Sequence, residues 1–319
     1  YVVPSKSFHE SLKEKILQEK DDFIVITGSP GVGKSTYLSY LFNELNDENI
    51  PVVRHHYYLS STDREFERFD HRRVSESIMS DILNKFPDEL GGLGNKNPFY
   101  KDLFKWIEKC GKSFKKEGKK LVLIIDGLDH VIRRDDSVKE LKKFFDLLLP
   151  IPDGILIILG TQELDESHLP RNLVLASPKE SWIKIPFLDK KAVQEWLINN
   201  KEKINVAEIE LKQLSEYFYQ KSEGHPLHLK YSLRYLLEQE IPINENSIKS
   251  LPGISHQDIR AYYDELWLML NDEEHQVLHL LAACDFVWPI EGLIDCFTLQ
   301  GVKKSQINYS IKRVKHLLE

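Results

Sequence analysis

The octapeptide Gly28–Ser35 constrains the fold of this chain more than any other feature. Its sequence, Gly-Ser-Pro-Gly-Val-Gly-Lys-Ser, matches the phosphate-loop pattern G-x-x-x-x-G-K-[ST] at every position. The loop follows a short, β-branched apolar run at Phe23–Thr27 and leads into a helical pattern from Lys34. A strand, this loop and a helix, in that order, predict a site for the phosphates of a nucleoside triphosphate.

Each residue type in the loop has a physical task. Glycines let the backbone wrap around phosphates with its N–H groups pointing inward, and the helix N-terminus adds a favourable dipole. We expect Lys34 to reach the β- and γ-phosphates of ATP or ADP, and the Ser35 hydroxyl to ligate Mg²⁺. The residues of the loop predicted to bind nucleotide are Gly28, Ser29, Pro30, Gly31, Val32, Gly33, Lys34, Ser35 and Thr36.

Two carboxylates follow the strongest strand pattern, the apolar run Leu121–Ile125. Asp126 ends this run, and Asp129 lies three residues later. A carboxylate at the carboxyl end of a central strand can hold Mg²⁺ through water, and we predict this role for Asp126. We predict that Asp129 orients or deprotonates the attacking water, although either aspartate could instead cap a helix. The predicted catalytic residues are Lys34, Asp126 and Asp129, and the predicted metal ligands are Ser35 and Asp126.

Two later segments carry candidate nucleotide contacts. Thr161 and Gln162 follow the next buried strand, 154–159, where a polar side chain could sense the γ-phosphate; turn chemistry is the alternative. The segment Gly224-His225-Pro226-Leu227 opens a helix with proline in its first turn, which is a structural role by itself.

The order of the apolar patterns predicts the fold class. Short apolar runs alternate with helical patterns up to about residue 188, which predicts an α/β core with a parallel sheet covered on both faces. A further edge strand is expected at 183–185. From Lys190 only helical patterns follow. We therefore predict a P-loop core at 1–188, a helical lid at 189–252 and a small helical domain at 253–319.

Charge and cysteine content exclude some classes of function. The chain has 43 Lys and Arg against 50 Asp and Glu, a net charge of −7, which argues against a nucleic-acid coat but leaves room for a local basic patch. Its three cysteines, Cys110, Cys284 and Cys296, are far apart and fit a reducing compartment. No apolar run reaches the ~20 residues that span a bilayer. We expect a cytoplasmic protein with no membrane partner, cut from a larger chain at both ends.

A mixed-charge segment follows the second strand pattern. Arg54-His55-His56-Tyr57 precedes a stretch that holds four more arginines, Arg64, Arg68, Arg72 and Arg73. These arginines could complete a neighbouring subunit's ATP site or bind a partner. The interleaved acidic residues favour the alternative, a solvated surface. The two histidines have no zinc-ligand spacing with any cysteine.

With these motifs the sequence resembles the STAND class of signal-transducing P-loop ATPases, in its NACHT-like branch, among the AAA+ relatives. The resemblance covers almost the whole chain and rests on four motifs: Gly28–Ser35, Asp126-Gly127-Leu128-Asp129, Gly160-Thr161-Gln162 and Gly224-His225-Pro226-Leu227. It implies that the last domain is a winged helix. It also implies that Pro226 packs near the adenine and that Val2-Val3-Pro4 passes the base.

Two departures from the family pattern bear on activity. Where NACHT proteins usually carry an acidic residue after the second aspartate, this chain has His130, which suits slow hydrolysis. The family's histidine that reads the β-phosphate has no position that can be assigned. The combination of Arg54-His55-His56-Tyr57 with Asp-Gly-Leu-Asp-His is similar to bacterial STAND proteins of antiphage defence.

The resemblance implies a nucleotide-driven switch. ADP would hold the lid and the winged helix closed, a protein trigger would permit exchange for ATP, and the open form would self-associate through the core. An alternative is a DNA-associated AAA+ ATPase of the origin-loading or transposition-helper kind. A small-molecule kinase that shares only the loop is a third possibility.

Overall fold

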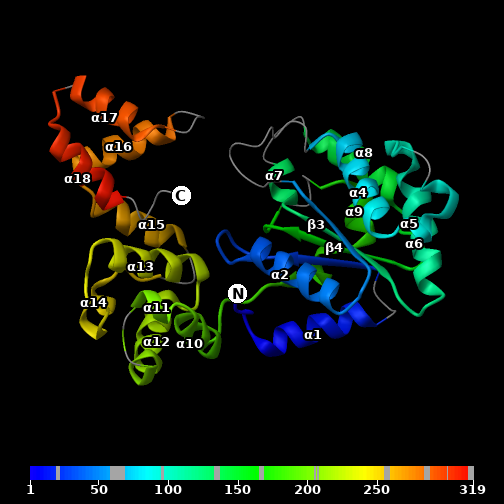
Figure 1. Ribbon diagram of the computed structural model, residues 1–319, viewed down its shortest axis with the longest axis horizontal. Coiled ribbons are helices and arrows are strands. Elements are labelled where there is room, and N and C mark those ends of the chain that lie inside the picture. The colour runs from blue at the N-terminus through cyan, green and yellow to red at the C-terminus, as the bar shows by residue number, and fades with distance from the viewer. Residues whose placement is uncertain are drawn as a thin grey trace. The chain divides into compact units, whose positions relative to one another are not determined.

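The chain forms two compact units (Figure 1). One unit is Lys6–Pro186, and the other joins Tyr1–Ser5 to Phe187–Glu319. The computed structural model describes residues 1–18, 22–57, 69–94, 97–132, 137–164, 169–204, 206, 208–254, 259–283, 288–299 and 301–314. Cys284, Arg64 and Arg68 lie outside these ranges, so the hypotheses about them have no structural counterpart.

The first five residues belong to the C-terminal unit rather than to the core. The backbone N–H of Asp189 donates to the carbonyl of Pro4 at 2.9 Å, and Val2 packs in an apolar cluster with Leu188 and Val193. The compact unit that holds the sheet is therefore Lys6–Pro186, and the predicted core at 1–188 stays a prediction. The division of the second unit near residue 252 stays a prediction.

The Lys6–Pro186 unit is built on a five-stranded sheet, among the described residues, in the order β2-β3-β4-β1-β5. Every pair in it is parallel. The strands are β1 Phe23–Thr27, β2 Val52–His56, β3 Leu121–Asp126, β4 Ile155–Thr161 and β5 Ile183–Lys184. All residues of β3 and β4 are buried, because helices cover both faces. The predicted α/β class with a parallel sheet is confirmed, and β5 is an edge strand.

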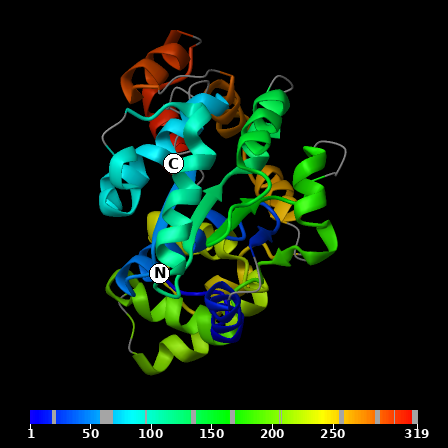
Figure 2. The ribbon, with the colours of Figure 1, turned by 90° about the vertical axis from the view of Figure 1, so that its right-hand side faces the viewer.

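Helices pack on the sheet from two sides (Figures 1 and 2). The core between the sheet and α4, α6 and α8 is built from alternate residues of the strands, such as Leu123 and Ile157, together with Trp106 and Phe145. Helices α1 and α2 lie on the other side. The helices of this unit are α1 Lys6–Leu17, α2 Lys34–Asp47, α4 His71–Lys85, α5 Pro87–Leu90, α6 Leu103–Lys115, α7 Leu128–Ile132, α8 Ser137–Leu148 and α9 Arg171–Ala176, with 3₁₀ turns at Gly91–Leu93, Tyr100–Asp102 and Lys179–Ser181.

Side chains of α4 cover the outer edge of β2. Lys85 Nζ donates to the carbonyl of Val52 at 3.1 Å, and the backbone N–H of Arg54 donates to Asp81 Oδ2 at 3.4 Å. Residues two apart in a strand direct their backbone groups to the same edge, so these two bonds satisfy groups that an edge strand would otherwise expose. Asp81 and Lys85 are themselves an i,i+4 ion pair at 3.5 Å.

The described elements of the C-terminal unit are all helices. Helices α10 to α14 surround one apolar cluster that includes Phe218 and Leu229, and α16 to α18 surround a second that includes Val277 and Phe297. Their bounds are α10 Lys190–Asn199, α11 Lys201–Ile204, α12 Glu208–Ser222, α13 Pro226–Glu238, α14 Glu245–Ser250, α15 Ile259–Leu268, α16 Asp272–Ala282, α17 Ile290–Leu299 and α18 Lys304–Val314. Over the described ranges, no helix has the length and apolarity needed to cross a membrane.

The two described cysteines lie within helices, and neither is fully exposed. Cys110 is buried in α6, and burial raises the pKa of its thiol to about 12, so it stays protonated and unreactive at neutral pH. Cys296, in α17, is partly buried. Both are free thiols.

Candidate nucleotide site

The loop 28–35 joins the end of β1 to the start of α2 in a conformation that only glycine adopts readily. Gly31 and Gly33 have φ angles of 75° and 90°, and Gly33 caps α2 without a side-chain hydrogen bond. Lys34 is 8% exposed, and its Nζ donates to the carbonyl oxygens of Gly28 at 2.9 Å and Ser29 at 3.2 Å. The ammonium group is thus held against the loop's own backbone, while Ser35 and Thr36 are exposed on the first turn of α2.

Gly28 has no space for a side chain. A Cβ there would lie 2.8 Å from Cγ2 of Ile185 and 3.0 Å from Cγ1 of Val32. Ile185 is held in place because its backbone N–H donates to the carbonyl of Thr27 at 2.8 Å. The edge strand β5 and its following residue therefore support the base of the loop, and Gly28 permits this close approach.

Asp126 is held between the ends of two neighbouring strands. It pairs in register with His56 of β2 and with Gly160 of β4, and it is 4% exposed. Nδ1 of His56 lies 3.5 Å from Oδ2 of Asp126. A Cβ at Gly160 would lie 2.4 Å from Oδ1 of Asp126, so glycine at this position leaves the carboxylate its space.

Asp129 lies in the first turn of α7 and is 3% exposed. Its Oδ1 accepts a hydrogen bond from the backbone N–H of Gln162 at 3.3 Å, which ties it to the residue just after β4. Nε2 of His130 lies 3.9 Å from its other carboxylate oxygen. Asp129 lies inside the first turn of α7 rather than at its N-cap, and its Oδ1 accepts from a residue that follows a strand, not from the backbone of its own helix.

Two buried hydroxyls mark the same edge of the sheet. Thr27 and Thr161 pair in register at the ends of β1 and β4. The Oγ1 atoms of both are buried, and neither has a hydrogen-bond partner among the described residues. Buried polar atoms are normally satisfied, so these hydroxyls indicate that a polar ligand or water is expected there.

The structure brings together most of the residues predicted for the site. The loop 28–35, Asp126, Asp129, Thr161 and Gln162 all lie at the carboxyl edge of one parallel sheet, where ligands of open α/β sheets bind. Sequence reasoning missed Thr27 and the contact of His56 with Asp126. Both could have been found only from the order of the strands.

Pro226 belongs to the other compact unit, where it is the first residue of α13. Two residues earlier, Gly224 permits a close approach of two backbone segments, because a Cβ there would lie 2.0 Å from the carbonyl oxygen of Leu188. His225 is buried with its ring centroid 5.1 Å from that of Phe187. These contacts account for the fold of the segment, and the adenine contact of Pro226 stays a prediction.

Glu163 adds a negative charge beside the loop. Its Oε1 lies 2.8 Å from Nζ of Lys184 in β5. The hydrogen bond from Lys184 is the main reason that the pKa of Glu163 is lowered, and the positive charges of Lys179 and Lys34 contribute. Glu163 therefore remains ionised and sits in the electrostatic field of Lys34.

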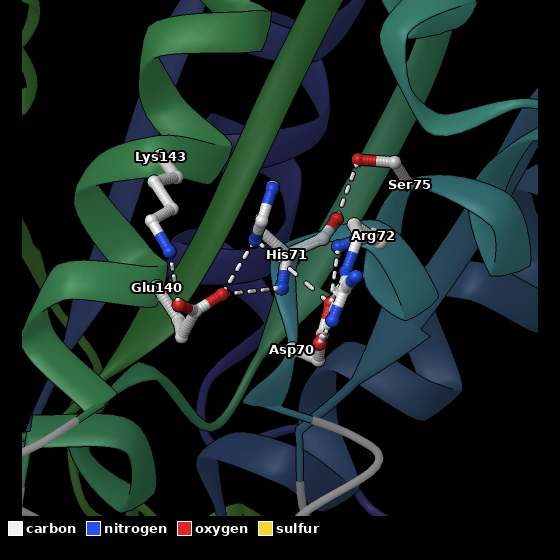
Figure 3. Close-up of polar contacts among 6 residues, drawn as sticks. All are labelled: Asp70, His71, Arg72, Ser75, Glu140 and Lys143. Carbon is white, nitrogen blue, oxygen red and sulfur yellow. Dashed lines mark hydrogen bonds and ion pairs between the residues drawn. The ribbon is translucent and has the colours of Figure 1, made fainter.

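A separate polar cluster joins α4 to α8 (Figure 3). Potential ligand atoms of Asp70, His71 and Glu140 lie within 4.8 Å of one another. Nδ1 of His71 lies 2.5 Å from Oε2 of Glu140, while Arg72 pairs with Asp70 at 2.7 Å and Lys143 with Glu140 at 2.6 Å. The bond from Arg72 lowers the pKa of Asp70 to about 2. Because each carboxylate already faces a cation, we interpret this cluster as an ion-pair network that fixes the first turn of α4.

The chain matches one protein family over most of its length. The family is described as an ATPase domain predominantly from Archaea, and its model matches residues 10–232. No curated protein matches the chain.

Several solved structures are similar to the chain at low identity. The Aeropyrum pernix ORC1 protein in complex with DNA is 12% identical, with a TM-score of 0.45, over 99% of this chain and 84% of that one. Drosophila ORC bound to DNA is 14% identical, with a TM-score of 0.49, over 97% and 84%. AMPPCP-bound DnaA from Aquifex aeolicus is 13% identical, with a TM-score of 0.43, over 99% and 89%. Identities of this size do not transfer a ligand or a partner to this chain.

The family match spans the phosphate loop, both aspartates and the tip of β4. The parallel sheet places these segments at one edge, as ATP binding by a P-loop requires. The chain belongs to this family of ATPase domains found predominantly in Archaea, and it is a P-loop ATPase.

Proposed function

We propose that this chain is a magnesium-dependent ATPase that acts as a switch, in which the bound nucleotide governs the arrangement of the C-terminal helical unit. The observation that supports this most directly is the hydrogen bond between the backbone of Gln162 and Asp129. Strand β4 lies between β1, which leads into the loop, and β3, which ends at Asp126 and is followed by Asp129 in α7. A shift of the backbone at the carboxyl end of β4 would therefore displace both the phosphate loop and Asp129.

The chemistry proposed for this edge uses residues of the chain in separate roles. Lys34 would leave the carbonyls of Gly28 and Ser29 to bind the phosphates, and the loop amides would surround them. Asp129 would orient the attacking water or accept its proton. The hydroxyl of Thr161 and the polar Gln162 would contact the γ-phosphate, the only group that distinguishes ATP from ADP.

The donor set also suits Mg²⁺. Ser35 is exposed on the first turn of α2, and Asp126 holds its carboxylate at the end of β3 with space left by Gly160. Hydroxyl and carboxylate oxygens are the hard ligands that Mg²⁺ prefers. When bound, the ion would neutralise phosphate charge; Ser35 would ligate it directly and Asp126 through water.

The resemblance to STAND proteins suggests how the nucleotide is coupled to the helical unit. Pro226, at the start of α13, would contact the adenine and so connect the nucleotide to the helical unit. ADP would favour a closed arrangement and ATP an open one that self-associates through the core. The slow hydrolysis suggested by His130, a protein trigger and a role in antiphage defence stay predictions of that resemblance.

Mass measurement tests the switch. We expect light scattering to give a monomer with Mg-ADP and a larger species with Mg²⁺ and a non-hydrolysable ATP analogue. Pro226→Ala should release nucleotide faster than wild type, whereas Pro242→Ala, in the loop before α14, should retain it. A mass that does not depend on nucleotide would refute the switch, while equal retention by both variants would leave Pro226 only its role at the helix start.

A second candidate function is binding of duplex DNA, and one surface favours it. Helix α18 has basic residues and no acidic ones, and Lys304, Gln306, Asn308, Tyr309 and Lys312 are exposed on it. Such side chains bind phosphates and base edges. Arg313 is engaged elsewhere, because its Nε lies 2.9 Å from Oε1 of the buried Glu274.

Salt dependence separates the two candidates. If α18 binds DNA, affinity for a duplex should fall steeply between 50 and 200 mM salt, as roughly expected when several phosphates are neutralised. Replacing both Lys304 and Lys312 by glutamine should weaken binding and reduce that slope. Equal weak binding by wild type and the double variant would remove this candidate.

A further inference from the structure

A hollow of about 590 Å³ lies between α2, the edge strand β2 and α4. Its lining is mostly polar and includes Asn46, Arg54, Asn84 and Lys85, with Phe42 as the one aromatic side chain. Phe42 and Asn46 lie 8 and 12 residues after Lys34 in α2, which corresponds to roughly 12–18 Å along the helix. The hollow is therefore separate from the nucleotide site.

Arg54 presents an unused guanidinium group to this hollow. Its Cζ lies 4.3 Å from the centroid of the Phe42 ring, and the side chain is half-buried. Among the residues that the structure describes, no acceptor or carboxylate pairs with the guanidinium; only the backbone N–H of Arg54 bonds to Asp81. Contact with an aromatic ring is a cation–π interaction that uses none of the five N–H donors of the guanidinium.

Lys85 brings a second positive charge to the same ring. Its Nζ also lies 4.3 Å from the Phe42 centroid, so the two cations are at most twice that distance apart. Asp81 is the acidic residue that lines the hollow, and it already bonds to the backbone of Arg54 and to Lys85. The hollow thus holds two cations and one carboxylate; the carboxylate and Lys85 also bond at the strand edge, and the guanidinium of Arg54 does not.

We infer that this hollow binds a phosphate group. A guanidinium placed against an aromatic ring can bind two oxygens of a phosphate in a bidentate arrangement, and a nearby ammonium adds charge. The side-chain amides of Asn46 and Asn84 supply further neutral donors, which suit a group with several acceptor oxygens. The phosphate could be free, as in a small metabolite, or part of a nucleic-acid backbone, and its recognition is the same in both cases.

The test uses the full chain with its nucleotide site filled by Mg-ADP. Inorganic phosphate is titrated at constant ionic strength set with chloride, and binding is followed by calorimetry. We expect saturable binding by wild type and an affinity at least ~10-fold lower for Arg54→Gln, the loss typical of a charge-assisted bond. Arg171→Gln removes the same charge from the exposed start of α9 and should bind phosphate as wild type does.

A second variant, a control for ADP affinity and an oligonucleotide titration complete the test. Asn84→Asp adds a negative charge at an exposed position of the hollow, so it should weaken phosphate binding even if Arg54→Gln fails to fold. ADP affinity, measured on the same samples, should be unchanged in all variants, which separates this site from the proposed switch. A short single-stranded oligonucleotide that binds more tightly than phosphate, and only with Arg54 present, would identify the nucleic-acid source. No saturable phosphate binding by wild type, or equal binding by wild type and Arg54→Gln, would overturn the inference.

Discussion

His56 and Asp126 end neighbouring parallel strands at paired positions, with Nδ1 of the histidine 3.5 Å from Oδ2 of the aspartate. The side chain of His56 is only 14% exposed and that of Asp126 only 6%. The imidazole therefore restricts the carboxylate on the side facing β2, while Gly160 leaves it space on the side facing β4. We interpret His56 as a positioning residue for Asp126.

His56→Ala should lower the rate of ATP hydrolysis by several-fold and leave ADP affinity nearly unchanged. The reason is that the carboxylate of Asp126 loses a neighbour that orients it, while the phosphate loop is untouched. The measurement is a comparison of kcat with ADP affinity, and His130→Ala, which removes an imidazole 3.9 Å from Asp129 instead, serves as a comparison variant. An unchanged kcat for His56→Ala would leave the contact without a role in activity.

Asp129→Asn should bind ATP with nearly the affinity of wild type and hydrolyse it at least ~100-fold more slowly, as expected when a general base is removed. Asparagine keeps the size of the side chain and can still accept the hydrogen bond from Gln162, so the fold around α7 should persist. Single-turnover kinetics with pre-bound ATP separates chemistry from binding. A single-turnover rate equal to that of wild type would exclude Asp129 as the base.

Gly160→Ala should destabilise the Lys6–Pro186 unit by about 1–3 kcal/mol, the usual cost of overpacking. The new Cβ would lie 2.4 Å from both Oδ1 of Asp126 and Cδ1 of Leu38, so these side chains must move. Activity should fall with stability because Asp126 is displaced. Gly92→Ala is the control, since a Cβ there has nothing within 4 Å. Equal urea midpoints for the two variants would contradict the packing around Asp126.

His228 should make the C-terminal unit sensitive to mild acid. Its Nε2 lies 2.9 Å from the carbonyl oxygen of Pro252, and burial is the main cause that lowers the pKa of His228 to about 4. A histidine has a pKa of about 6.5 when unfolded, so the stability it contributes is present above that pH and is lost as pH falls towards 4. At one pKa unit per 1.36 kcal/mol, the loss amounts to roughly 3 kcal/mol.

The measurement for His228 is the free energy of unfolding between pH 7 and pH 4. His228→Gln cannot titrate, so its stability should fall less steeply than that of wild type over this window, whatever its stability at pH 7. Parallel slopes for the two proteins would show that His228 does not cause the pH dependence.

Local patterns in the sequence were sufficient to locate the phosphate-loop motif and the two aspartates and to predict the fold class. Gly28–Ser35 has a distinctive composition, and the apolar runs before it and before Asp126 are short and rich in β-branched residues, which favours strands over helices. The parallel sheet follows from their alternation with helices. These features depend on neighbouring residues in the chain, which is why they could be predicted.

Contacts that depend on strand order could not be predicted. The pairing of Thr27 with Thr161 exists because β4 lies beside β1, and that of His56 with Asp126 because β2 lies beside β3. No local pattern states which strands are neighbours. The packing of residues 1–5 with the C-terminal unit is likewise a tertiary contact with no local signal.

The ends of helices and the shortest helices could not be predicted from the sequence either. Helix α4 begins at His71, three residues before its first buried side chain, Val74, because Asp70 caps it by accepting from the N–H of Arg72. Helices α5, α7 and α9 have four to six residues, too few to show a 3.6-residue period. The alternative for Asp129 was a helix cap, and it lies instead within the first turn of α7.

Calorimetric titration of Mg-ADP and of a non-hydrolysable ATP analogue into wild type and Lys34→Ala tests the central claim most directly. Lys34 Nζ donates to the carbonyls of Gly28 and Ser29 in its own loop, and we expect it to exchange them for phosphate oxygens. We predict saturable binding of both nucleotides by wild type and an affinity at least ~100-fold lower for the folded variant, since a charge-assisted contact with the phosphates is lost. Equal affinities in the two proteins, or no binding by wild type, would contradict the assignment of the nucleotide site.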